Sequence, residues 1–122
     1  MKYFYLLFLL FLISCNKPSN LTPKELRNGT FKTILEKGKY ESVATRNDSM
    51  QIETYQTKKD TFYITWKNNF EYSLLKKSPK TDLDKKKFIV KITGISENSY
   101  TFSAHFKGSN YKQKGKALKL KD

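Results

Sequence analysis

The chain has 122 residues, which leaves room for one folded domain and excludes a large multidomain machine. It carries 24 basic and 11 acidic residues, for a formal net charge of +13, while 15% of its residues are aromatic, which excludes a disordered chain. Cys15 is the single cysteine, so an intrachain disulfide and a CxxC metal or redox site are excluded.

The first fifteen residues have the pattern of an export signal. Lys2 supplies a positive start, residues 3–13 form an unbroken apolar or aromatic run, and the small Ser14 precedes Cys15. As a helix, this run would span about 16 Å, well short of the roughly 30 Å hydrocarbon core of a bilayer. We therefore expect residues 1–14 to be a cleaved signal peptide and not a permanent membrane span.

The segment Leu12-Ile13-Ser14-Cys15 resembles the lipobox of bacterial lipoproteins. The resemblance implies that Cys15 becomes the first mature residue and carries lipid, and two or more acyl chains would hold the protein stably on its membrane. The alternative is an ordinary signal peptide in which Cys15 is incidental, and it would still export the protein. Asn16-Lys17-Pro18 contains neither a retention aspartate nor an acidic run. We therefore expect a location in the cell envelope, on the outer membrane facing the periplasm.

Residues 15–28 are predicted to form a lipidated tether that ends in one helical turn. Residues 16–20 are polar and contain Pro18, as a tether would. Thr22-Pro23-Lys24-Glu25 has the spacing of a capping box, with proline at the first helical position. Asn28-Gly29 should stop the helix.

Residues 29–122 are predicted to form a β-barrel-like domain, because short segments with period-two alternation follow one another between turn residues. The predicted strands are Thr30–Leu35, Lys39–Arg46, Ser49–Gln56, Thr61–Lys67, Phe70–Lys76, Lys87–Ile95, Ser99–Phe106 and Lys114–Leu120. The connections are short enough for antiparallel hairpins, apart from a longer loop at 78–85. The pattern favours an all-β antiparallel meander of about eight strands, as a small up-and-down, lipocalin-like barrel or a curled sheet.

The predicted core lies on the aromatic face of the alternating strands. Its strongest members are Phe62, Ile64, Trp66, Phe70, Tyr72, Leu74, Phe88, Val90, Ile92, Tyr100, Phe102, Ala104 and Phe106, with weaker contributions from Met50, Ile52, Leu118 and Leu120. An eight-stranded barrel is just wide enough to be filled by side chains or to hold one small ligand. Because the strands are short and the rings many, we expect a filled interior.

The sequence does not predict an enzyme, a cofactor or a metal site. His105 is the single histidine and is expected on the solvent side, without a second histidine to serve a nucleophile. Asp82 and Asp84 lack the glycine and glutamate of an EF-hand loop. Glu53 and Glu71 would pair only if their strands are neighbours. GxGxxG, GxxxxGK[ST] and HExxH motifs are absent from the sequence.

Thirteen of the 22 lysines lie between Lys76 and Lys121, which predicts a basic rim at one end of the sheet. The candidate surface for an anion or a partner consists of Lys107, Tyr111, Lys112, Lys114 and Lys116. Such a surface would suit an envelope protein, an anionic headgroup or an anionic polymer, and the alternative is a merely solubilising surface. We expect no nucleic-acid partner, because lysine alone reads no base sequence and an exported protein rarely meets nucleic acid.

Three segments together resemble a family of small uncharacterised bacterial lipoproteins. They are Gly29-Thr30-Phe31-Lys32, Arg46-Asn47-Asp48-Ser49-Met50-Gln51-Ile52-Glu53, and Ile64-Thr65-Trp66 with Phe70-Glu71-Tyr72-Ser73-Leu74. Some members of that family carry an automatic DNA topoisomerase IV label. The resemblance implies no activity, and we reject the label because the chain has no nucleotide-binding loop and too little mass to pass one duplex through another.

Three classes of function remain. We expect a non-catalytic interaction or structural module of the envelope with a basic surface. The alternative is a carrier of a small apolar ligand in the barrel mouth, which would need a cavity of about 300 Å³ or more. An enzyme ranks last, since it would need a concave site with convergent ionisable groups.

Overall fold

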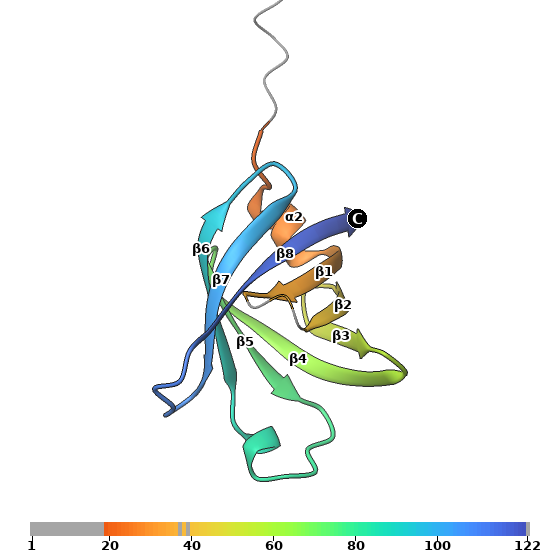
Figure 1. Cartoon of the computed structure of the whole chain (residues 1–122), viewed down its shortest axis with the longest axis vertical. Coiled ribbons are helices and arrows are strands. Elements are labelled where there is room, and N and C mark those ends of the chain that lie inside the picture. The colour runs from red at the N-terminus through yellow and green to blue at the C-terminus, as the bar shows by residue number, and fades with distance from the viewer. Residues whose placement is uncertain (1–18, 37, 39, 122) are drawn as a thin grey trace, which may run out of the picture.

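The structure is a computed structural model that describes residues 19–36, 38 and 40–121, and its fold is all-β (Figure 1). Eight antiparallel strands close into a barrel in which each strand pairs with its neighbours in sequence and the first pairs with the last. The strands are β1 (Gly29–Leu35), β2 (Glu41–Arg46), β3 (Met50–Tyr55), β4 (Lys58–Asn68), β5 (Glu71–Lys76), β6 (Phe88–Ile95), β7 (Ser99–Phe106) and β8 (Gln113–Lys121). A helix, α2 (Pro23–Arg27), and a 3-10 turn, η1 (Leu83–Lys85), complete the fold.

The predicted signal peptide, the lipobox and Cys15 lie outside the described residues. Neither helix found in the described part of the chain has the length and apolar character needed to cross a membrane. The lipid anchor therefore stays a prediction.

All eight predicted strands are confirmed, and the largest difference in their bounds is at the β3–β4 hairpin. We expected Lys58 to Asp60 to be a turn, but these residues begin β4. Tyr55 pairs directly with Lys58, so that Gln56 and Thr57 alone connect the two strands. Gln56 takes a positive φ of 53°, as a two-residue hairpin turn requires.

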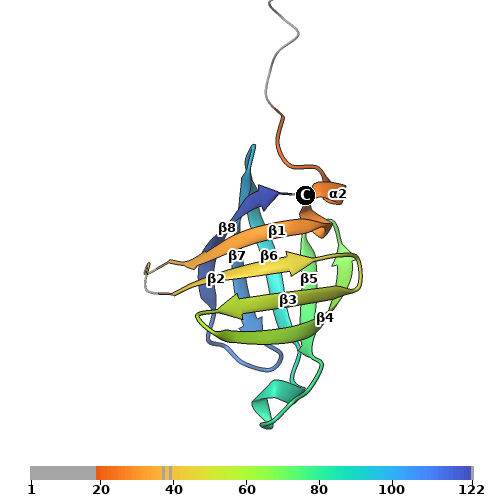
Figure 2. The same cartoon turned by 90° about the vertical axis from the view of Figure 1, so that its right-hand side faces the viewer.

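The predicted capping box is confirmed, and the helix that it begins lies across one end of the barrel (Figure 2). The Thr22 hydroxyl accepts a hydrogen bond from the Glu25 amide at 3.3 Å, and the Thr22 amide donates to the Glu25 carboxylate at 3.1 Å. Leu26 is 1% exposed and belongs to the core. Lys119 Nζ on β8 donates to the Glu25 carbonyl at 2.7 Å, which joins α2 to the barrel wall. Helix α2 therefore closes this end.

The predicted core face is confirmed on β4 to β7, where Ile64, Tyr72, Leu74, Val90, Tyr100, Phe102 and Ala104 are buried. Phe70 is an exception, because it lies in the turn between β4 and β5 and is exposed. The prediction is also wrong on β8. There Ala117 is buried while Leu120 is exposed and Leu118 only half-buried, since Lys119 pairs with the buried Phe31 and so shares its face.

The face predicted for β3 is reversed in the structure. Met50 is half-buried and Ile52 is 43% exposed on the outer surface, so neither belongs to the buried cluster. The register explains the reversal, because Gln51 pairs with Arg46 of β2 and with Phe62 of β4. Residues directly opposite in a ladder point to the same side of a sheet. The inward positions of β3 are therefore polar.

The two ends of the barrel differ in charge. The strand connections at the α2 end, residues 47–49, 69–70 and 96–98, contain Asp48 and Glu97 and no lysine. The connections at the other end hold lysines that we call the basic rim: Lys77, Lys80, Lys85, Lys86, Lys87, Lys107 and Lys112. The predicted concentration of positive charge at one end of the sheet is thus present.

Candidate ligand-binding site

The barrel contains a cavity of about 390 Å³, so the expected filled interior is wrong. Its outer lining comes from strand ends and loops opposite α2, among them Thr33, Lys76 and Gln113. The cavity exists because the inward positions of β2 and β3 hold short or polar residues such as Ser42 and Glu53.

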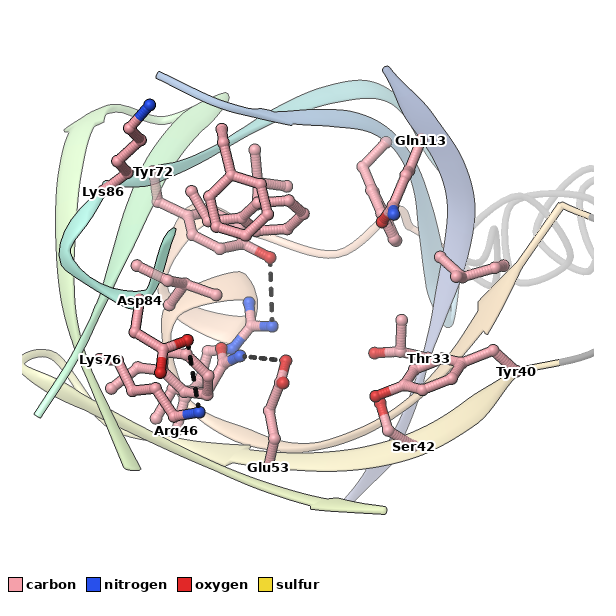
Figure 3. Close-up of a pocket in the computed structure, with 18 of the residues that line it drawn as sticks. Thr33, Tyr40, Ser42, Arg46, Glu53, Tyr72, Lys76, Asp84, Lys86 and Gln113 are labelled. Atoms are coloured by element: carbon pink, nitrogen blue, oxygen red, sulfur yellow. Dashed lines mark hydrogen bonds and ion pairs between the residues drawn. The ribbon is translucent and has the colours of Figure 1, made fainter. Parts of the chain in front are cut away.

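The cavity wall is divided into an apolar and a polar sector. The apolar sector consists of Phe62, Leu74, Phe88, Val90, Phe102 and Phe106, on β4 to β7. The sector on or beside β1 to β3 is mostly polar, with Leu35 as its apolar member. We call it the polar sector, and its polar residues are Thr33, Tyr40, Ser42, Arg46, Gln51 and Glu53. Figure 3 shows Thr33, Tyr40, Ser42 and Glu53 reaching the cavity from the same part of the wall. A molecule with one apolar and one polar side would match this division.

Arg46 lies at the deep end of the cavity and is 5% exposed. Its Nη1 donates to the Leu26 carbonyl of α2 at 3.1 Å, and its Nη2 donates to the Tyr100 and Tyr72 hydroxyls at 2.8 and 3.4 Å (Figure 3). The two hydroxyl oxygens are themselves 3.0 Å apart. The guanidinium also lies over the Phe31 ring, 4.3 Å from its centroid. Arg46 thereby connects α2, β2, β5 and β7.

The buried groups around Arg46 keep their ordinary charge states. Burial alone would lower the pKa of Arg46, but its contacts with Tyr100 and Tyr72 outweigh this and raise it. Burial raises the pKa of Tyr72 well above its usual value, so the phenol stays neutral. No ion pair between described residues includes Arg46, and its Nε–H has no hydrogen-bond partner. A buried donor in this position is costly unless a ligand or water accepts from it.

Gln51 and Glu53 lie next to each other on the inner face of β3. Gln51 is 2% exposed, and its Nε2 donates to Glu53 Oε1 at 3.1 Å, while its own Oε1 has no partner. Burial raises the pKa of Glu53, against the opposing effects of Arg46 and the Gln51 hydrogen bond. The polar sector therefore offers an unpartnered acceptor, an unpartnered donor and a carboxyl group.

The mouth of the cavity is held together by ion pairs. Lys76 Nζ lies 3.7 Å from Asp84 in the loop that contains η1 (Figure 3). It also lies 3.4 Å from Asp60, so that Lys76 connects β4, β5 and this loop. The Asp84 carboxylate also accepts hydrogen bonds from the Lys80 and Thr81 amides, at 3.0 and 3.2 Å. These bonds, that of Lys80 above all, lower the pKa of Asp84. The loop at 77–87 is thus fixed beside the opening.

The raised pKa of Glu53 predicts a specific pH dependence of stability. The folded protein holds this proton more tightly than the unfolded chain, so the contribution of Glu53 is fully present below its unfolded pKa and is lost as the pH rises through its folded pKa. In urea unfolding from about pH 4 to pH 7, the protein should therefore lose more stability than the variant Glu53→Gln. Glu41→Gln, on the outer side of β2, is the matched control and should follow the unsubstituted protein. Parallel curves for all three proteins would contradict the assignment.

The structure does not bring the acidic residues and the histidine of the sequence analysis into one site. His105 pairs with Ile89 and does not line the cavity. Glu53 and Glu71 are separated by β4, which pairs with both of their strands, and so form no carboxylate pair. Asp82 forms an ion pair with Lys85 at 3.9 Å. Within the described ranges, no three His, Cys, Asp or Glu residues are grouped to hold a metal.

The predicted surface residues lie in two places. Lys107, Tyr111 and Lys112 belong to the connection between β7 and β8 at the mouth end, where Tyr111 is 72% exposed. Lys114 and Lys116 lie on the outer side of β8 and line a second, more open depression of about 390 Å³ between β8 and its neighbours. None of the five lines the cavity inside the barrel. Their role as a binding surface stays a prediction.

Arg46, Gln51 and Glu53, the polar floor of the cavity, were not predicted as a site. The sequence holds one signal that points to them. Ser42, Ala44 and Arg46 share one face of the alternating segment 41–46, and a single turn then carries this face over to Gln51 and Glu53. The isolated arginine in a chain of lysines marks this face.

Comparisons with known proteins found no match. No protein-family model matches the chain, no curated protein is similar to it, and no solved structure resembles it closely enough to count. The function must therefore be inferred from the geometry of the chain itself.

Proposed function

We propose that this protein is a lipid-anchored protein of the bacterial cell envelope that binds one small amphiphilic molecule inside its barrel. The observation that carries the proposal is the cavity of about 390 Å³, with an apolar sector on one side and a polar sector on the other. This volume lies within the range typical of small-molecule sites, about 300–1,000 Å³. The proposal therefore favours the hypothesis of a small-ligand carrier over that of a purely structural module.

The test is binding of 1-naphthylamine, a neutral dye that is small enough for the cavity and whose emission depends on the polarity of its surroundings. We expect saturable binding of one dye molecule per chain. Val90→Trp should weaken that binding by about tenfold or more, because Val90 is buried in the apolar sector and the indole would occupy the cavity. The readout is a fluorescence titration, with circular dichroism to show that the variant keeps its strands.

Val43→Trp is the matched control, since Val43 faces outward from β2 and is 38% exposed. It should bind the dye as the unsubstituted protein does. Equal weakening in both variants, or no saturable binding at all, would contradict a site inside the barrel.

The anchor is proposed on the lipobox segment Leu12-Ile13-Ser14-Cys15. Cys15→Ser should move the protein from the detergent phase to the aqueous phase of a detergent-partition experiment, because it removes the acylated thiol. Mass spectrometry of the native protein should find lipid on Cys15 and no residues before it. An intact Met1 and an unmodified thiol would contradict both the anchor and the envelope location.

The basic rim supports a second role at the same end of the molecule. Its seven lysines lie in the loops at the mouth end, where Lys86 lines the cavity, and Asp82 and Asp84 are the acidic residues in the loop at 77–87. A cluster of this kind attracts anionic lipid surfaces, and the attraction weakens as salt screens it. We propose that the rim places the mouth against anionic headgroups of a membrane surface other than the one that holds the anchor, from which a ligand can enter.

A further inference from the structure

The chemistry of the cavity floor restricts the ligand further, and the restriction rests on the proposed function. Three residues that line the floor carry polar groups relevant to a ligand. The Arg46 Nε–H donor and the Gln51 Oε1 acceptor are buried without a partner, and the Glu53 carboxyl accepts one hydrogen bond from Gln51. Arg46 and Gln51 are 5% and 2% exposed, so both side chains are almost completely buried. Buried polar atoms in native proteins nearly always have partners, which makes two neighbouring unpartnered atoms a sign of an absent molecule.

From this geometry we infer that the floor recognises an uncharged polar group that both donates and accepts hydrogen bonds, such as a hydroxyl pair or a primary amide, carried on a short apolar chain. Its acceptor would take the Arg46 Nε–H, and its donors would meet Gln51 Oε1 and Glu53. The apolar chain would extend along Phe62, Val90 and Phe102 toward the mouth.

The arrangement of charges at the floor disfavours an ionised ligand. An anion placed there would meet the Glu53 carboxyl and the partially negative Gln51 Oε1. A cation would meet the guanidinium of Arg46, which already donates to Leu26, Tyr72 and Tyr100. A neutral donor and acceptor pair satisfies both unpartnered atoms and requires no charge to be buried.

The size of the cavity sets the length of the chain. At roughly 30 Å³ per non-hydrogen atom, the cavity holds about 13 such atoms, so that an octyl chain with a polar end of two atoms, about ten atoms in all, fits inside it. The test therefore uses probes that share an octyl chain: 1,2-octanediol, octanamide, octanoate, octylammonium and octane. Each probe competes with 1-naphthylamine for the detergent-solubilised, full mature protein.

We expect the diol and the amide to displace the dye at concentrations about tenfold lower than octanoate, octylammonium or octane do. Gln51→Leu should weaken binding of the diol by roughly two- to tenfold, which is the loss expected for one hydrogen bond between uncharged groups. The same variant should leave binding of octane unchanged. Gln113→Leu is the matched control, because Gln113 lines the cavity at the mouth and not at the floor.

The possible outcomes separate this inference from the proposed function. Tightest binding of octanoate or octylammonium, or equal binding of every probe including octane, would overturn the inference and leave a ligand-binding barrel. Failure of every probe and of the dye would overturn both. If Gln51→Leu and Gln113→Leu weaken binding of the diol equally, the inference that the floor recognises the polar group is also overturned.

Discussion

Replacing Arg46 by alanine is expected to lower the free energy of unfolding by about 3 kcal/mol or more, because it removes the donors for three buried acceptors at once. The Leu26 carbonyl loses its hydrogen bond from Arg46 at the α2 end of the barrel. The hydroxyls of Tyr72 and Tyr100 keep only the hydrogen bond between them. A gap also opens beside Phe31, whose ring lies under the guanidinium. Urea denaturation followed by tyrosine fluorescence measures the loss.

Arg27→Ala is the natural comparison, since the chain has two arginines. Arg27 is half-buried, lies 5.0 Å from the centroid of the Trp66 ring and donates one long bond to Asn69, at 3.4 Å. Its removal should cost about 1 kcal/mol or less. Arg46→Met, which fills the space without leaving a buried cation, should cost less than Arg46→Ala. Equal free energies of unfolding for Arg46→Ala and Arg27→Ala would show that Arg46 does not have this central role.

Gly115→Ala should destabilise the barrel by about 2–3 kcal/mol, because an added Cβ has no room at the seam between β1 and β8. It would lie 2.8 Å from the Ile34 carbonyl oxygen of β1 and 2.7 Å from Cζ of the Phe102 ring. The carbonyl belongs to the strand that closes the barrel and cannot move without separating the seam. The expected signature is a fall in Tm of about 4–8 °C for each kcal/mol lost.

Gly94→Ala tests the same chemical change in β6, where space is easier to find. The added Cβ would lie 2.9 Å from the Thr101 hydroxyl, an exposed side chain that can rotate away. The expected loss is below about 1 kcal/mol. A larger loss of stability for Gly94→Ala than for Gly115→Ala would show that crowding at the seam between β1 and β8 does not explain the effect at Gly115.

The strands and their order could be predicted because turn residues and period-two alternation act locally. Ile64, Tyr72, Val90 and Phe102 lie where the alternation places them. The β3–β4 hairpin escaped prediction because its turn consists of Gln56 and Thr57, which carry no glycine, proline or asparagine signal. The backbone of Gln56 takes a positive φ that the register between the two strands imposes.

The site could not be predicted in the same way, because its polar residues contradict the rule that identifies a core. Ile52 would be assigned inward by hydrophobicity, yet it lies outside while Gln51 and Glu53 lie inside. The face of β3 is decided by its pairing with β2 and β4, which is a long-range property of the sheet. The same reversal places polar side chains inside the barrel, next to the cavity.

The two ends of the closed barrel differ, because α2 covers one end and the cavity opens at the other. The described chain begins beside α2, on the side that Arg46 and Leu26 block, whereas solvent reaches the interior from the far side. A protein fastened through its leading segment would therefore present its opening away from the lipid layer that holds it. A bound molecule would then enter and leave at the end opposite the attachment, without displacing α2.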